Sequence, residues 1–197
     1  LAELHIDETT PDPEGGHIVR DLSSADQRRP NGILEETATH HARDKTLDLS
    51  ASDAWQMTKL ATAEYLQYGV TTASAGGMPT AIASLLGPMS TYNQMPLRVA
   101  LFPFFDEVGA GLLAGELALD EFASGRVFVP RVKIIADGSI QGFTGYLSQP
   151  YHRPYKGDAD YRGYPSVPRE ALFEQVEGLY RQRVQVAIHG NGDASIE

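Results

Sequence analysis

The sequence predicts an α/β fold with a parallel sheet, and two observations support this class. Short apolar runs near residues 70, 99, 133 and 186 have the length and composition of buried strands. Helical patterns separate these runs, and strands that alternate with helices pair in parallel through right-handed crossovers. Four such units fit either half of an eight-stranded barrel or a doubly wound open sheet. The apolar runs alone do not distinguish the two.

The first helix is expected to begin at Ser52 or Asp53 and to end before Gly69, because Ser and Asp cap helices and Gly ends them. Its apolar positions repeat at three and four, which predicts a buried stripe made of Met57, Leu60, Ala61, Tyr65 and Tyr68. A short buried strand is expected at 70–73. A turn at Gly76–Gly77 and a helical piece over 81–86 then complete this part of the chain.

The second half continues the alternation. A strand is expected at 97–105, a glycine-diluted helix at 108–122 and a further strand at 131–136. Ser166 and Pro168 indicate the start of the last long helix, whose buried stripe contains Leu172, Val176 and Leu179. The closing strand covers 183–188.

Two segments do not follow this alternation. Residues 1–50 are polar and rich in Pro and Gly, so we expect loops and short strands in an accessory segment that precedes a barrel-like domain at 51–197. His40 and His41 are adjacent and are interpreted as ordinary solvated residues. A long aromatic loop at 137–165 interrupts the second domain, and loops of this length are commonly functional.

Composition excludes several classes of function. The net charge of −10, without a Lys/Arg cluster, argues against nucleic acid and anionic membranes as partners. No apolar run approaches the roughly 20 residues that span a bilayer. Cysteine is absent, so thiol nucleophiles and thiolate metal sites are excluded and a cytoplasmic location is expected. Any metal must be held by His, carboxylate or a less usual ligand.

Candidate functional residues emerge from the faces of two strands. Side chains alternate along a strand, so Val184, Val186 and Ile188 share a face suited to packing under helices. His189 lies on the other face, at the strand end, where active sites of parallel barrels assemble. Lys133 lies inside an otherwise apolar strand. Because an unpaired buried ammonium is costly, Lys133 is expected to be paired with a carboxylate such as Asp137, chemically modified, or neutral.

Several stretches carry a family resemblance. Val132-Lys-Ile-Ile-Ala-Asp-Gly-Ser-Ile140 and Gln185-Val-Ala-Ile-His-Gly-Asn-Gly-Asp193 resemble motifs of amidohydrolase family 3, which includes N-substituted formamide deformylase-like proteins. The segments 10–21, 31–36 and 69–72 are similar to the same family. The resemblance spans essentially the whole chain, in order.

The resemblance implies a partial TIM-type (β/α) barrel that contains the family's second to fifth strands. Lys133 would be carboxylated and bridge two divalent metals, with His189 as a ligand to one of them and zinc as the expected metal. A carbamate supplies two oxygen donors and neutral imidazole suits zinc, so the residue types agree with this role. The implied activity is hydrolysis of an amide-like, non-peptide carbon–nitrogen bond in a small molecule.

The departures from the family pattern are informative. Its His-x-His pair, its sixth-strand His and its general-base Asp have no counterparts, and Ala73–Gly76 replaces a strand end that often carries His-Asp or Gln-Asp. We therefore expect an internal segment without a complete metal site that is inactive alone. The intact enzyme is expected to hold one or two metal ions, and the segment by itself none. Open sheet edges predict a homo-oligomer.

Other residues remain candidates with alternatives. Asp137, Ser139 and Asp193 could contact substrate or support the metal ligands, although Asp137 could equally form a turn and Asp193 could cap a helix. The aromatic residues of loop 137–165 either line a pocket or cover a rim. Two other functions stay open: a Schiff-base lyase or aldolase that uses Lys133, and a non-catalytic scaffold.

Overall fold

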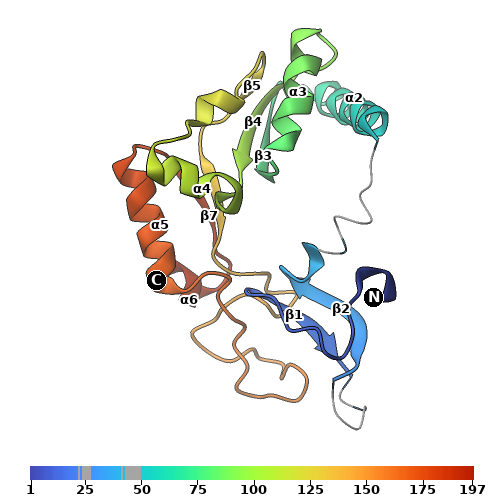
Figure 1. The fold of residues 1–197 in the computed structure, drawn as a ribbon, viewed down its shortest axis with the longest axis vertical. Helices are drawn as coiled ribbons and strands as arrows, with labels where there is room; N and C mark the ends of the chain where they lie inside the picture. The colour runs from blue at the N-terminus through green and yellow to red at the C-terminus, as the bar shows by residue number, and fades with distance from the viewer. Residues whose placement is uncertain (22, 24–27, 41, 43–49) are drawn as a thin grey trace. The chain divides into compact units, whose positions relative to one another are not determined.

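The computed structural model of the chain describes residues 1–21, 23, 28–40, 42 and 50–197 (Figure 1). Contacts divide these residues into two compact units. Unit 1 comprises Leu1–Asp48, Ile135–Arg169 and Gly190–Glu197, and unit 2 comprises Leu49–Ile134 and Glu170–His189. The loop at 137–165 therefore has its contacts in unit 1, while the predicted domain boundary at residue 50 stays a prediction. His41 lies outside the described residues, so the interpretation of the His40–His41 pair is not tested.

Unit 2 contains parallel strand pairs. β4 (Arg98–Pro103) pairs in parallel with β3 (Thr72–Met78) on one side and with the short β5 (Val127–Phe128) on the other. A parallel bridge between Phe104 and Lys133 connects the end of β4 to β6 (Val132–Ile135), which is the neighbour of β7 (Val186–His189). The predicted α/β class with parallel strands is confirmed.

The helices of unit 2 are α2 (Ala51–Gln67), α3 (Ala81–Thr91), α4 (Phe105–Ala114) and α5 (Arg169–Arg181), with the 3-10 helix η2 at Leu119–Phe122. α2 precedes β3, and the other helices of unit 2 lie between these strands in the chain. All four predicted helical regions are present. The glycine-diluted region is shorter than expected, because α4 ends where Gly115 adopts φ 71° and η2 follows separately.

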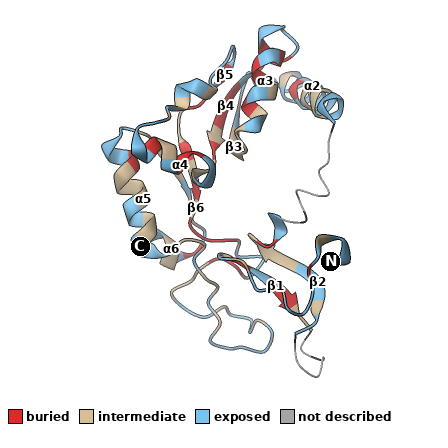
Figure 2. Ribbon diagram, viewed as in Figure 1, coloured by how far each residue is buried: buried red, intermediate tan, exposed pale blue. Residues whose placement is uncertain are grey.

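Two apolar clusters form the core of unit 2, and Figure 2 shows buried residues on the strands and on the helices beside them. One cluster joins α3 to β4 and β5. The other joins Val132 and Ile134 of β6 to Val108 and Leu112 of α4 and to Leu179 of α5. Leu172 and Val176 of α5 and Val184 and Val186 beside them pack against this second cluster, as their sequence pattern predicted.

α2 differs from the prediction in its N-cap and in its buried residues. The helix is capped by Ser50, whose hydroxyl accepts from the Asp53 N–H in a capping box. Its expected buried stripe is wrong: Met57, Leu60, Tyr65 and Tyr68 are exposed. Trp55 and Leu66 pack against the core instead. The helix carries apolar residues on more than one side, so their spacing did not decide which side would be buried.

β3 also differs from the prediction. It runs from Thr72 to Met78, through the glycines where a turn was expected, and no residue of it is fully buried. β3 stands at the edge of its three-stranded sheet, so it has one paired neighbour, β4, and its other edge is unpaired in this sheet. In β7, Ile188 was expected to pack under helices but is 44% exposed, since the second apolar cluster reaches only as far as Val186.

Unit 1 contains two of the short strands expected in the accessory segment, and they form a hairpin. β1 (Gly16–Arg20) and β2 (Pro30–Glu36) pair antiparallel, and Ile18 packs with Ile6 and Ala38. The 3-10 helix η1 (Ala2–Leu4) and the short α6 (Asp193–Ile196) also belong to this unit. Among the described residues, no helix is both long and apolar enough to cross a membrane.

The first turns of α3 and α4 are tied together at the ends of β3 and β4. Oε2 of Glu107 accepts the Thr80 N–H at 2.8 Å and the Thr80 hydroxyl at 2.9 Å. Thr80 is the N-cap of α3 and its own side chain makes no capping bond, so Glu107 satisfies a donor that the helix itself leaves without a partner.

Replacing Glu107 by Ala is expected to lower the free energy of unfolding by about 1 kcal/mol, since a charged acceptor is removed from a helix N-terminus. Asp106→Ala is the matched control, because Asp106 is an exposed acid of the same helical turn and no bond joins it to α3. Urea denaturation of both variants measures the difference. Equal destabilisation by the two substitutions would contradict the assigned role of Glu107.

Candidate functional site

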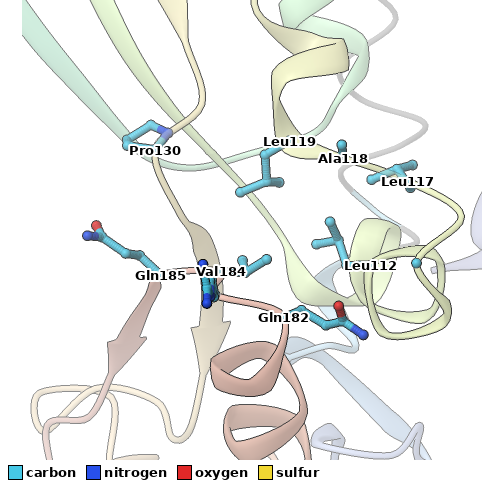
Figure 3. Close-up of a pocket in the computed structure, with 10 residues that line it drawn as sticks. Leu112, Leu117, Ala118, Leu119, Pro130, Gln182, Val184 and Gln185 are labelled. Carbon is cyan, nitrogen blue, oxygen red and sulfur yellow. The ribbon is translucent and has the colours of Figure 1, made fainter.

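Lys133 and His189 lie on one face of neighbouring strands. The Val132 N–H donates to the Gln185 carbonyl at 3.0 Å, and the arrows that follow Pro130 and Gln185 point the same way (Figure 3). This pairing sets Val132 beside Val186, and both pack against the apolar cluster of α4 and α5. Because side chains alternate, Lys133 and His189 face away from those helices. His189 lies two residues beyond the level of Lys133.

The surroundings of Lys133 exclude one of the alternatives for this residue. Lys133 is half-buried, and among the described residues its ammonium group has neither a hydrogen bond nor an ion pair. The expected pairing with Asp137 is therefore wrong. Phe104 is its neighbour across the strand bridge, and a side chain built at Gly77 would meet its Cγ at 3.5 Å. Sequence patterns did not single out Phe104.

Asp137 is fully buried, and its carboxylate is bound by backbone donors. Oδ1 accepts the Asn191 N–H at 2.9 Å, and Oδ2 accepts the N–H groups of Tyr146 at 2.9 Å and Gly192 at 2.8 Å. Three such bonds satisfy an ionised carboxylate and offset its burial. The group therefore holds the segment after β6, the aromatic loop and the segment after β7 together within unit 1.

Small residues around this carboxylate are required by close packing. A Cβ at Gly192 would lie 1.7 Å from the Tyr146 carbonyl oxygen, and one at Gly138 would lie 2.0 Å from the Thr144 hydroxyl. The Asn191 side chain adds a further link by donating to the Gly138 carbonyl at 2.8 Å. The Asp-Gly and Gly-Asn-Gly sequences at the two strand ends are thus explained by one packed arrangement.

Ser139 lies in a tight turn that follows Asp137. Its carbonyl accepts the N–H groups of Gly142, Thr144 and Gly145 at 3.0 to 3.2 Å, and its own N–H donates to the Thr144 hydroxyl at 2.9 Å. Thr144 is 3% exposed and donates to Glu36 Oε1 at 2.5 Å, which joins the turn to β2. The backbone of Ser139 therefore has a structural role here, and a substrate role for its side chain stays a prediction.

Asp193 is exposed at the first position of α6. Its carboxylate accepts the Ser148 N–H at 2.9 Å and also the Ser148 hydroxyl, so it connects α6 to the aromatic loop. The expected capping role is wrong: Gly192 is the N-cap residue, and no side-chain capping bond forms. The bonds from the hydroxyl and the amide of Ser148 hold the pKa of Asp193 below its ordinary value.

The aromatic residues of loop 137–165 pack on one another. Ring centroids are 5.0 Å apart for Phe143 and Tyr151, 5.0 Å for Phe143 and Tyr155, and 4.8 Å for Tyr155 and Tyr161. The Tyr155 hydroxyl donates to Glu35, and burial followed by this bond raises the pKa of Tyr155 above its usual range. The rings thus form a small core for the loop. Their role in substrate contact stays a prediction.

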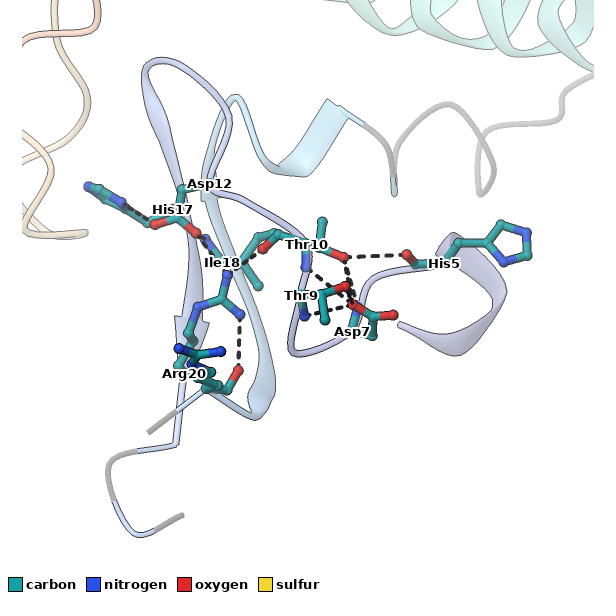
Figure 4. Close-up of polar contacts among 9 residues, drawn as sticks. His5, Asp7, Thr9, Thr10, Asp12, His17, Ile18 and Arg20 are labelled. Carbon is teal, nitrogen blue, oxygen red and sulfur yellow. Dashed lines mark hydrogen bonds and ion pairs between the residues drawn. The ribbon is translucent and has the colours of Figure 1, made fainter. Parts of the chain in front are cut away.

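A separate polar cluster holds the N-terminal segment on β1 (Figure 4). Asp12 accepts the Ile18 N–H at 3.1 Å and lies 2.9 Å from Nδ1 of His17, while Arg20 donates to the Thr10 carbonyl at 2.7 Å. His17 and Asp12 are 49% and 38% exposed. The polar groups of this cluster bond to one another, so a structural role explains why these residue types are present, and no ligand is needed to explain them.

The structure also contains a cavity of about 500 Å³ in unit 2, shown in Figure 3. It lies where β6 and β7 begin, and Leu112, Leu119, Pro130 and Val184 are among its lining residues. His189 ends β7, so the cavity lies at the opposite end of the strand. In the part of the chain that the structure describes, no three His, Asp or Glu side chains gather closely enough to hold a metal ion.

Comparison with known proteins now decides the family. A profile described as the amidohydrolase family matches residues 1–197. The chain belongs to the amidohydrolase family. The predicted resemblance is therefore confirmed at the level of the family.

Individual relatives agree with this assignment. A Bacillus subtilis (strain 168) protein, YtcJ, is an amidohydrolase by name and is 24% identical over 210 residues, which cover all of this chain and 36% of YtcJ. Crystal structures of metal-dependent hydrolases from Pyrococcus horikoshii OT3 and Pyrococcus furiosus share the fold, with TM-scores of 0.65 and 0.64 and identities of 24% and 21%. The chain aligns over 100% and 98% of its own length and spans 36% and 37% of theirs.

Asp137→Asn should destabilise this amidohydrolase-family chain by roughly 3 kcal/mol, because the amide replaces one acceptor oxygen and leaves buried N–H donors without a partner. Asp160→Asn is the control, since Asp160 is exposed in the same unit. Denaturant unfolding of both variants checks the difference. If Asp137→Asn unfolds like Asp160→Asn, the carboxylate does not hold the three segments.

Acid should release the link between Asp193 and Ser148. Because the folded-state pKa of Asp193 is lowered, the contact is complete above the ordinary value of 3.8 and is lost as the pH falls through the lower folded value. The amide resonance of Ser148 in NMR should report this titration. Asp193→Asn should abolish that pH dependence, and a midpoint at or above 3.8 in the unmodified chain would contradict the assignment.

Proposed function

We propose that the chain is part of a metal-dependent hydrolase that cleaves amide-like, non-peptide carbon–nitrogen bonds in small molecules. Lys133, as its carbamate, and His189 are the proposed metal ligands. Family membership supports hydrolysis in general, and the Pyrococcus structures with the same fold bear the description of metal-dependent hydrolases. The bond specificity rests on the resemblance of the two strand motifs.

One observation carries the proposal. Lys133 and His189 come from adjacent strands and occupy the face that the helices leave uncovered. Lysine is a poor choice inside an apolar strand unless its amine is used, and no carboxylate of the described residues neutralises it. An unpaired amine at this place fits a group that gains charge and ligand oxygens by carboxylation.

The donor set fits a hard or borderline divalent cation. A carbamate gives oxygen donors and His189 gives an imidazole nitrogen, a combination that suits zinc, although other divalent metals accept it. Two donors do not complete a tetrahedral site, and the described residues supply no third His, Asp or Glu nearby. We infer that the remaining ligands and the general base come from other parts of the protein, and that this segment alone is inactive.

The metal would polarise the substrate carbonyl and lower the pKa of a water molecule, which is the chemistry that amide hydrolysis requires. The residues of this chain would place it. Lys133 would extend from within β6, and His189 would present its ring at the end of β7. Asp137, Ser139 and Asp193 are proposed substrate-binding or supporting residues.

The architecture that we propose around this site is a partial TIM-type barrel. β3, β4, β6 and β7 would be its second to fifth strands, with the short β5 as an addition between β4 and β6. β3 pairs in parallel with β4, and a parallel bridge joins the end of β4 to β6. Exposed edges and the exposed apolar residues of α2 support association with further copies. A cytoplasmic location and a small-molecule substrate complete the proposal.

Metal analysis of the full-length protein tests the assignment. Lys133→Ala and His189→Ala should each lower metal affinity by about 10-fold or more and abolish hydrolysis of amide-like substrates, because each removes a ligand. Lys59→Ala is the control, since Lys59 is an exposed lysine of α2. Isotopically labelled bicarbonate should give a carbamate ¹³C signal that Lys133→Ala removes and Lys59→Ala keeps.

Two results would overturn the proposal. Full metal content in Lys133→Ala would show that the lysine is not a ligand. Covalent trapping of a carbonyl substrate on Lys133 by borohydride would instead establish the Schiff-base lyase or aldolase, which needs the amine free. Family membership favours the hydrolase over the Schiff-base lyase or aldolase.

A further inference from the structure

A β-bulge lies in β3, whose neighbour β4 is followed by Phe104, the bridge partner of Lys133. Ala75 pairs with Leu101 and Met78 with Pro103, so β3 uses three steps where β4 uses two. The extra residue falls at Gly76–Gly77. Bulges of this kind redirect a strand locally and are frequent next to active sites.

Gly77 brings the bulged backbone against two side chains. It adopts φ 146°, which residues with a side chain rarely adopt, and a Cβ there would lie 2.9 and 3.0 Å from Cε1 and Cζ of Phe104. The same Cβ would lie 3.5 Å from Cγ of Lys133. Gly76 differs, because a Cβ there would meet nothing within 4 Å. Only one of the two glycines is therefore required by its surroundings.

The position of the bulge is fixed from both sides. Phe104 is bridged to Lys133 and begins α4 as its N-cap, so its ring extends from an anchored backbone. Beyond the bulge, Thr80 is bound by Glu107 of the same helix at 2.8 and 2.9 Å. The backbone of Gly77 thus lies beside both the Phe104 ring and Cγ of Lys133, and Phe104 is bridged to Lys133. We refer to the Gly77 backbone and the Phe104 ring together as the wall.

We propose that Gly77 and Phe104 are positioning residues for Lys133, which confine its stem and thereby fix the direction of its Nζ. The catalytic consequence rests on the proposed function, because a carbamate can serve as a ligand only if its oxygens occupy a defined place. A lysine stem is otherwise among the most flexible of side chains and loses much rotamer entropy on ordering. The wall removes that freedom before any ligand binds.

NMR relaxation of ¹³C-labelled lysine tests the wall without metal or carbon dioxide. In the unmodified protein, Cε of Lys133 should relax as a restricted group and Cε of the exposed Lys59 as a mobile one, with Lys133→Arg and Lys59→Arg assigning the signals. Gly77→Ala should displace the Phe104 ring, so Lys133 should lose its restriction and relax like Lys59. Gly76→Ala is the matched control and should leave Lys133 unchanged.

Each outcome decides the proposal. The proposal is overturned if Cε of Lys133 still relaxes as a restricted group in folded Gly77→Ala. It is also overturned if Gly76→Ala makes this carbon as mobile as Gly77→Ala does. If Gly77→Ala does not fold, Phe104→Leu replaces it, because this change keeps the backbone and removes the ring: loosening of Lys133 supports the wall and unchanged relaxation overturns it. Carboxylation is measured separately, so a protein without a carbamate signal but with the expected loosening would contradict the function and leave the positioning role established.

Discussion

Unit 1 depends on the buried carboxylate of Asp137. Its oxygens accept three backbone N–H groups, from Tyr146 in the aromatic loop and from Asn191 and Gly192 after β7. Burial of a carboxylate without hydrogen bonds would be strongly unfavourable, so the burial of Asp137 depends on the three N–H donors. The three N–H groups in turn depend on Asp137 as their acceptor. The glycines that crowd this group follow from it, since only a residue without a side chain lets the backbone approach so closely.

The sequence predicted those elements whose pattern is local. The apolar stripe of α5 and the strands around Lys133 and His189 are examples, because packing against one cluster imposes a regular spacing on Leu172, Val176 and Leu179. The donors to Asp137 could not be predicted in this way. Two of them lie 54 and 55 residues further along the chain, and nothing in their local sequence indicates the acceptor.

The wrong predictions have equally specific causes. Two adjacent glycines usually mark a turn, but here they form a bulge that continues β3, and a side chain at Gly77 would meet the ring of Phe104, the N-cap of α4. α2 is apolar on more than one side, so spacing alone did not decide which side faces the core. Both errors occur where tertiary contacts select among alternatives that local sequence permits equally.

The depths of Lys133 and His189 in their strands give a physical reason for the two residue types. Lys133 lies level with Ala187, two residues before His189, and two residues along a strand cover about 6.6 Å. A short imidazole can serve a site above the sheet only from the strand end, whereas the four-carbon stem of lysine can span that rise from within. Such a long stem is useful only if it is held straight, which is the role assigned to the bulge at Gly77 and the ring of Phe104. An aspartate at residue 133 would end too far below His189 for both side chains to reach the proposed metal ion, so the proposed metal role and the proposed positioning of the lysine stem depend on the same length of side chain.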